Sequence, residues 1–202
     1  DVSATGSTRL ELVSSRRVEP SLGPPPASAP AWASPTFGET QLLRTIRQPS
    51  SPRQPAVTLL VYGRDSTTAR YVLGNSPTGR LRYAFDFARF WRSPQSRDAT
   101  PQQVVWAAER GGVLFVETAH LGYASTSKGR NAYLTAIELA SGRIVWRTPA
   151  LVANASTFVV TDDVIVAGYG FTAEPDFLYM VDRRTGRLRQ RLALPTAPER
   201  IT

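Results

Sequence analysis

Residues 135–146 read TAIELASGRIVW, a strand-like apolar run, a polar turn and a second apolar run. Glu138 stands four positions before Gly142, Ser141 stands directly before that glycine, and Trp146 follows it by four positions. Carboxylate and hydroxyl oxygens accept hydrogen bonds from the N–H groups of a tight turn, and glycine adopts the positive φ that the turn needs. The pattern therefore predicts a β-hairpin whose tryptophan covers a neighbouring sheet.

The same pattern occurs twice more along the chain. Residues 71–83 read YVLGNSPTGRLRY, and residues 179–190 read YMVDRRTGRLRQ. Each has a polar residue four positions before the turn glycine, a threonine directly before it and an arginine directly after it. The three glycines are 63 and 44 residues apart. Propeller blades of four strands take roughly 40 to 50 residues, and an insertion at 88–103 accounts for the longer interval.

Short apolar runs alternate with turn signals from Val57 onward. Val, Ile, Tyr, Phe and Thr dominate the runs, as half-buried strands require, and the spacing of an amphipathic helix is not sustained. We predict an all-β fold: a partial β-propeller of about three four-stranded antiparallel blades, over about 42–87, 104–149 and 157–194. The expected strands beyond the first are Val57–Gly63, Tyr71–Gly74, Arg80–Phe87, Val104–Glu109, Val113–Ala119, Ala132–Leu139, Ile144–Thr148, Thr157–Thr161, Val164–Gly170, Phe177–Asp182 and Arg187–Leu194.

The first part of the chain has a different composition. Nine prolines lie between residues 14 and 55, among them a Pro24–Pro26 run that nucleates polyproline II. We predict that residues 1–55 are an extended Pro/Ser-rich arm, with 42–48 as a candidate for the first strand of blade one, followed by the propeller region 56–202. Trp32 and Phe37 are aromatic anchors in this arm, suited to docking on a surface of its own domain or of a neighbour.

Charge and composition exclude several classes of protein. The net charge is +8, but Lys128 is the only lysine among 24 basic residues, so we attribute the scattered arginines to a GC-rich coding bias. Nucleic-acid surfaces usually gather Lys and Arg in a stripe, and we do not favour that partner. Cysteine is absent, which excludes disulfides and thiolate sites. No apolar run has the roughly 18 to 20 residues that span a bilayer.

The chain begins at Asp1 rather than at a methionine. This start, together with abundant Ser, Thr, Pro and Arg and the absence of Cys, is typical of a bacterial exported protein whose signal peptide has been removed. We therefore predict a periplasmic or extracellular location.

The hairpin pattern Asp/Glu-x-x-Ser/Thr-Gly-x-x-x-Trp resembles the repeat of the pyrroloquinoline-quinone-like β-propeller family. Residues 135–146 match it fully; the third hairpin has Gln190 in place of the tryptophan, and the first matches weakly with Tyr83 in the aromatic place. The resemblance covers about 42–194 and implies a propeller architecture. Quinone-dependent dehydrogenases of that family close eight blades around cofactor and calcium, many with a vicinal cysteine pair. This chain has material for about three blades and no cysteine, so we expect no cofactor, no metal and no enzymatic activity.

Three blades cannot close a ring, and each blade must bury its faces against a neighbour. A bare face would be covered by another copy, by another protein, by the Pro-rich arm or by further blades of a longer propeller. Our hypothesis is a non-catalytic exported module that serves as a structural or accessory subunit and binds other proteins. The alternative is a ligand- or substrate-binding part of a multi-chain or longer propeller enzyme, and arginine-mediated nucleic-acid binding ranks third.

Each predicted blade has one long loop between its second and third strands, at 64–70, 120–131 and 171–176. Equivalent loops gather on one face of a propeller, and their mixed charges and aromatic rings suit a protein–protein patch. Ordinary solvated loops are the alternative. We assign no acid–base role to His120 beside Glu117. The candidate partner-binding residues are Trp32, Phe37, Arg64, Tyr123, Arg130, Tyr169, Phe171, Glu174 and Asp176.

Overall fold

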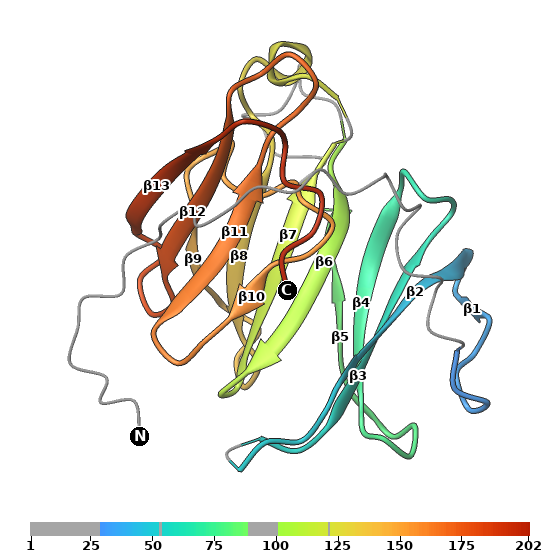
Figure 1. Ribbon diagram of the computed structural model, residues 1–202. Coiled ribbons are helices and arrows are strands. Elements are labelled where there is room, and N and C mark those ends of the chain that lie inside the picture. Colours follow the sequence, from blue (N-terminus) through green and yellow to red (C-terminus); the bar gives the residue numbers. More distant parts are fainter. Residues whose placement is uncertain (1–28, 53, 89–100, 121) are drawn as a thin grey trace.

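The computed structural model describes residues 29–52, 54–88, 101–120 and 122–202, and within these ranges three antiparallel sheets carry the fold (Figure 1). In each sheet the strands are hydrogen-bonded in chain order. Sheet 1 contains β1 (Thr36–Phe37), β2 (Thr40–Gln48), β3 (Val57–Gly63), β4 (Ala69–Asn75) and β5 (Leu81–Asp86). Sheet 2 contains β6 (Gln103–Arg110), β7 (Val113–Ala119), β8 (Tyr133–Glu138) and β9 (Ile144–Arg147). Sheet 3 contains β10 (Val159–Val160), β11 (Val164–Tyr169), β12 (Asp176–Asp182) and β13 (Leu188–Leu194).

These sheets confirm the prediction of an all-β partial propeller with four-stranded antiparallel repeats. Sheet 1 differs by its additional two-residue strand β1, which pairs with β2 across the turn at Gly38. The strand expected at 157–161 is shorter than predicted, since β10 spans two residues. Most of the predicted arm, residues 1–28, lies outside the described residues, as does 89–100 of the predicted insertion. Within the described ranges, no helix combines the length and the apolar character that a bilayer span requires.

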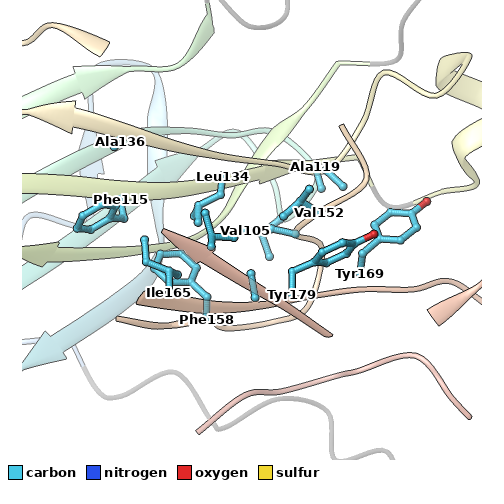
Figure 2. Packing of buried hydrophobic residues seen from close by; sticks show 14 of the residues in the cluster. Val105, Phe115, Ala119, Leu134, Ala136, Val152, Phe158, Ile165, Tyr169 and Tyr179 are labelled. Atoms are coloured by element: carbon cyan, nitrogen blue, oxygen red, sulfur yellow. The ribbon is translucent and has the colours of Figure 1, made fainter. Parts of the chain in front are cut away.

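The sheets stack face to face, and sheet 2 is buried on both sides. Side chains alternate between the two faces of a strand. Accordingly, Leu114 and Val116 of β7 pack into the cluster shared with sheet 1, whereas Phe115 packs into the cluster shared with sheet 3. Figure 2 shows this second cluster, in which Phe115 and Leu134 of sheet 2 meet Ile165, Phe158 and Tyr179 from the sheet 3 side. This double burial explains the near-continuous apolar runs of the sequence.

A tryptophan docked on a turn glycine joins sheet 2 to sheet 3. The indole Nε1 of Trp146 donates a 3.1 Å hydrogen bond to the Arg183 carbonyl, and the ring lies on Gly186. Gly186 has φ +71°, and a Cβ there would lie 2.6 Å from the indole Cδ2. Only glycine satisfies both the turn and the close approach at this position, and the positive φ is shared by all three turn glycines, Gly79, Gly142 and Gly186.

Trp32 makes the same contact at the outer face of sheet 1. Its Nε1 donates a 3.1 Å hydrogen bond to the Pro77 carbonyl, and its ring lies against Gly79 in the first hairpin turn. Next to it, Phe37 contacts the rings of Tyr62 and Tyr71 at centroid distances of 5.7 and 5.2 Å. The described part of the predicted arm therefore covers sheet 1 of its own chain.

The outer face of sheet 3 is covered by the C-terminal residues. Pro198 and Ile201 lie over Gly168 of β11, where a Cβ would come within 2.5 Å of the proline ring. The Ser156 N–H donates to the Glu199 carbonyl at 2.7 Å, and Thr157 exchanges two hydrogen bonds with the backbone of Ile201. Segments of the chain itself thus lie over the outer face of sheet 1 and the outer face of sheet 3. The described residues therefore do not leave the broad bare faces that three blades implied.

A buried carboxylate holds sheet 1 against sheet 2 near the C-terminal end of β6. Glu109 accepts a 2.7 Å hydrogen bond from the Tyr83 hydroxyl and pairs with Arg82 at 3.0 Å. Burial, reinforced by the bond to Glu109, raises the pKa of Tyr83, so the phenol stays protonated and keeps donating. The Tyr83 ring lies against Gly74 of the neighbouring strand β4 in its own sheet, whereas Trp146 lies against a turn glycine of the next sheet.

Two glycine substitutions test the docking contact. Gly186→Ala and Gly112→Ala both place a Cβ at positive φ, +71° and +76°, but the Cβ at Gly112 has no neighbour within 4 Å. We expect Gly112→Ala to cost about 1–2 kcal/mol of unfolding free energy through backbone strain. Gly186→Ala should cost a further ~1–3 kcal/mol because it displaces the Trp146 ring. Urea denaturation followed by tryptophan fluorescence measures both, and equal losses would contradict the docking role.

Candidate functional site

The loops β7–β8 and β11–β12 meet at one end of the stack, shown at the top of Figure 1. Tyr123 and Phe171 pack edge to face with ring centroids 4.8 Å apart. Glu174 accepts hydrogen bonds from the Ala124 N–H and from the Tyr169 hydroxyl. The structure thus brings together four of the predicted residues, and we call Tyr123, Tyr169, Phe171 and Glu174 the loop cluster.

The 3-10 helix η2 (Ala124–Ser127) gives the longer of these loops its shape. It ends at Lys128, whose φ of 52° is left-handed, and Gly129 follows with φ +74°. The Ser127 hydroxyl, almost fully buried, donates back to the Ala124 carbonyl at 3.0 Å. Tyr123 directly precedes this hydrogen-bonded turn and is 41% exposed.

The other predicted residues lie apart from the loop cluster or serve its frame. The Arg130 carbonyl accepts a hydrogen bond from Gln102 at 2.8 Å. Asp176 opens β12, where burial raises the pKa of its carboxyl group despite a hydrogen bond from the Phe171 backbone. Arg64 faces Glu39 at 3.7 Å, with both side chains largely exposed. The described contacts therefore do not join Arg64 to the loop cluster.

His120 is held in place at the end of β7. The backbone N–H of His120 donates a 2.8 Å hydrogen bond to Oδ1 of Asn131, and Asn131 is fully buried. Burial lowers the pKa of the imidazole, an effect that the charge of Glu174 opposes. The imidazole is therefore mostly neutral at pH 7. Among the described residues, no group of three or more His, Asp or Glu side chains is placed to hold a metal ion.

A cavity of about 310 Å³ lies where the first strands of the three sheets approach one another. We call it the inner pocket. Sheet 1 supplies part of β2 and β3 with the start of β4, sheet 2 supplies the start of β6, and sheet 3 supplies the segment before β10. Its lining comprises Leu43, Arg44, Val61, Ser66, Ala69, Gln103, Val104, Val105, Asn154 and Ser156.

The inner pocket adjoins the β11–β12 loop. Asn154 exchanges two hydrogen bonds with the backbone of Gly170, at 2.9 and 3.0 Å, and so ties the pocket wall to the start of that loop. Ser66 brings the β3–β4 loop to the same pocket. The three long loops therefore frame one end of the stack, although the described contacts pack only two of them directly together.

Two polar groups of the inner pocket have no hydrogen-bond partner among the described residues. They are Nη1 of Arg44 and Oε1 of Gln103, and both atoms are buried. Neither group could be predicted from the sequence, because a single Arg or Gln inside a short apolar run is also typical of a solvated strand position. The available signal was the interruption of the run Leu42–Ile46 by Arg44.

Glu117 of β7 is fully buried, and neither carboxylate oxygen has a hydrogen-bond partner among the described residues. Burial raises its pKa well above the ordinary value, and the charge of Arg44 opposes this only in part. The protonated form is consequently favoured in the folded protein.

Comparisons with known proteins give little beyond the fold. No protein-family model matches the chain, and no curated protein sequence matches it. Among solved structures, a europium-containing methanol dehydrogenase aligns with 76% of this chain at 13% identity and a TM-score of 0.42. The aligned part spans 27% of that protein. The assignment of the fold rests on the three stacked sheets themselves.

The frame of the loop cluster can be tested through Glu174. Glu174→Ala removes the acceptor of the Ala124 N–H and the Tyr169 hydroxyl, so we expect at least tenfold faster hydrogen exchange at the Ala124 amide. Glu39→Ala is the control, since Glu39 is a highly exposed carboxylate outside the cluster. Equal exchange at Ala124 in both variants would show that Glu174 does not hold the loop.

The buried carboxyl group of Glu117 predicts a pH-dependent stability. Because its pKa is raised on folding, the folded state binds more protons, and stability falls as the pH rises from the ordinary glutamate pKa toward the raised one. The side chain in Glu117→Gln cannot ionise. The unfolding free energy of this variant, relative to that of the wild type, should therefore rise between pH 4 and pH 7, by up to about 1.4 kcal/mol per pH unit. Urea denaturation at both pH values measures this gain, and a constant difference would contradict it.

Proposed function

We propose that this chain is a non-catalytic, exported propeller module that acts as a structural or accessory subunit and binds other proteins through the loop cluster. One observation carries the proposal. The Tyr123–Phe171 pair stands at the loop end of the three stacked sheets, with Tyr123 exposed and with Glu174 hydrogen-bonded to both loops. Exposed aromatic side chains on a fixed frame lose little conformational entropy on binding, and Tyr is enriched among the residues that dominate interface energies.

The charge of the chain supports a partner with an acidic surface. The net charge is +8, and Arg130 and Lys128 lie on the same loop as Tyr123. A positive surface accelerates association with acidic proteins and selects against basic ones. Trp32 and Phe37 already contact sheet 1 of this chain, so the proposal places the partner at the loop cluster rather than at these two residues.

The partner can be another subunit or a second copy of this chain. Light scattering on the purified protein separates the two cases, because self-association raises the mass with concentration. The proposal does not need a catalytic group at the loop cluster, since ring packing and hydrogen bonds suffice for binding.

A double variant tests the proposed surface. Tyr123→Ala/Phe171→Ala removes both rings, and Val145→Ala removes an exposed apolar side chain of β9 as a control. We expect a stoichiometric partner, or self-association, to persist in the wild type and in the control and to weaken at least tenfold in the double variant. Near-UV circular dichroism verifies that the variants are folded.

Co-purification from the native source with mass spectrometry, together with light scattering, gives the measurement. A wild-type protein that stays monomeric and retains no stoichiometric partner would overturn the proposal. Equal binding by the double variant would also overturn it.

A further inference from the structure

We infer that the inner pocket binds a carboxylate group, which Arg44 and Gln103 recognise from adjoining sheets. This inference rests on the proposed function in one respect: an acidic side chain of the partner protein is one source of the carboxylate. A small free carboxylate is the other source. Both present the same pair of oxygens to the pocket, and the experiment below distinguishes them.

Arg44 supplies the charge. It lies on β2 opposite Val61 of β3, and both residues line the pocket. Its guanidinium stands 5.9 Å from the ring centroid of Trp106, while its buried Nη1 has no acceptor among the described residues. A guanidinium stays protonated in proteins and presents its N–H donors in a fork that fits a carboxylate. A buried donor without a partner is costly, and a carboxylate in the pocket would satisfy it.

Gln103 supplies a second polar group from sheet 2. Its side chain is 5% exposed and lies at the start of β6, across the pocket from β2. A half-turn of the glutamine amide exchanges Oε1 and Nε2. The buried position now held by the unpartnered Oε1 of Gln103 can therefore present N–H donors to a ligand. Ser66 and Ser156 add hydroxyl groups to the lining. Residues with polar side chains therefore reach the pocket from sheet 1, from sheet 2 and from the segment before β10.

The electrostatics of the inner pocket favour an anion. Arg44 is the only charged residue in the lining formed by the described residues. The nearby acidic group that acts on it is Glu117, which lies outside the lining, and burial favours the protonated form of that carboxyl group. Glu117 attracts the guanidinium but does not accept a hydrogen bond from Nη1 of Arg44, and a ligand carboxylate would provide that acceptor.

The size of the inner pocket limits the ligand. About 310 Å³ is at the lower end of the roughly 300–1,000 Å³ typical of small-molecule sites. Apolar side chains from Leu43, Val61, Ala69, Val104 and Val105 form the rest of the wall. This combination suits a short aliphatic chain that ends in a carboxylate, such as glutarate or the side chain of glutamate.

Titration with defined probes tests the inference. Glutarate represents the free carboxylate, and acetyl-Gly-Gly-Glu-Gly-Gly-amide represents a protein side chain, since its only carboxylate is that of Glu. The same peptide with Gln is the matched control. We expect saturable binding of at least one carboxylate probe, weakened at least tenfold in Arg44→Gln and unchanged in Arg187→Gln, an exposed arginine at the opposite end of sheet 3. Binding of glutarate alone identifies a metabolite site, and binding of the Glu peptide identifies a partner side chain.

Nuclear magnetic resonance of the wild-type protein gives a readout that does not depend on the variant being folded. The side-chain amide signals of Gln103 and the Nε–H signal of Arg44 should shift on titration, while the Nε1–H signal of Trp32 should not. Absence of binding by both carboxylate probes, or equal binding of the Gln peptide, overturns the inference. So does unchanged affinity in folded Arg44→Gln. These outcomes would not contradict the proposed function of the loop cluster. Equal partner binding by the Tyr123→Ala/Phe171→Ala variant would contradict the proposed function and not the carboxylate site.

Discussion

A stacked sheet must bury both of its faces, and the whole structure follows from this constraint. The middle sheet meets it with alternating side chains: Leu114 and Val116 face one neighbour, and Phe115 faces the other. The two outer sheets meet it with segments of the chain itself, which bring Trp32 onto the first sheet and Pro198 onto the third. Apolar burial supplies the main driving force for this stacking, but it does not by itself fix how one sheet sits on the next.

Directional contacts supply that alignment. Trp146 has a hydrogen-bond acceptor and a bare glycine to lie on, so a shift of sheet 3 along sheet 2 would break both contacts at once. Glu109 does the same between the first two sheets through Tyr83 and Arg82. Such contacts specify one arrangement among many of similar buried area, and they lie at the end of the stack opposite the long loops.

The fold was predictable because its signals are local. The turn glycines, the acidic or amide residue before each of them and the alternation of apolar residues all act within about twelve positions, so the strands from Val57 to Leu194 could be predicted from the sequence. Long-range relationships could not. Nothing near Trp32 in the sequence shows that its partner is the turn at Gly79, and nothing near Arg44 shows that Gln103 lies across a cavity from it. The loops were predictable as a group, but the contacts within them were not.

Polar groups inside the stack are the part of the structure that packing alone does not explain. Glu109 is buried with Tyr83 and Arg82 as partners, so its burial serves the alignment of two sheets. Arg44 lies in the same interface beside the other end of β6, and its buried Nη1 has no acceptor among the described residues. A folded protein offsets such a cost with a partner that is absent from its own chain, or else it is less stable than it could be. Glu109 and Arg44 thus share a sheet interface and differ in their partners, and this difference is the reason for proposing a ligand beside Arg44 and none beside Glu109.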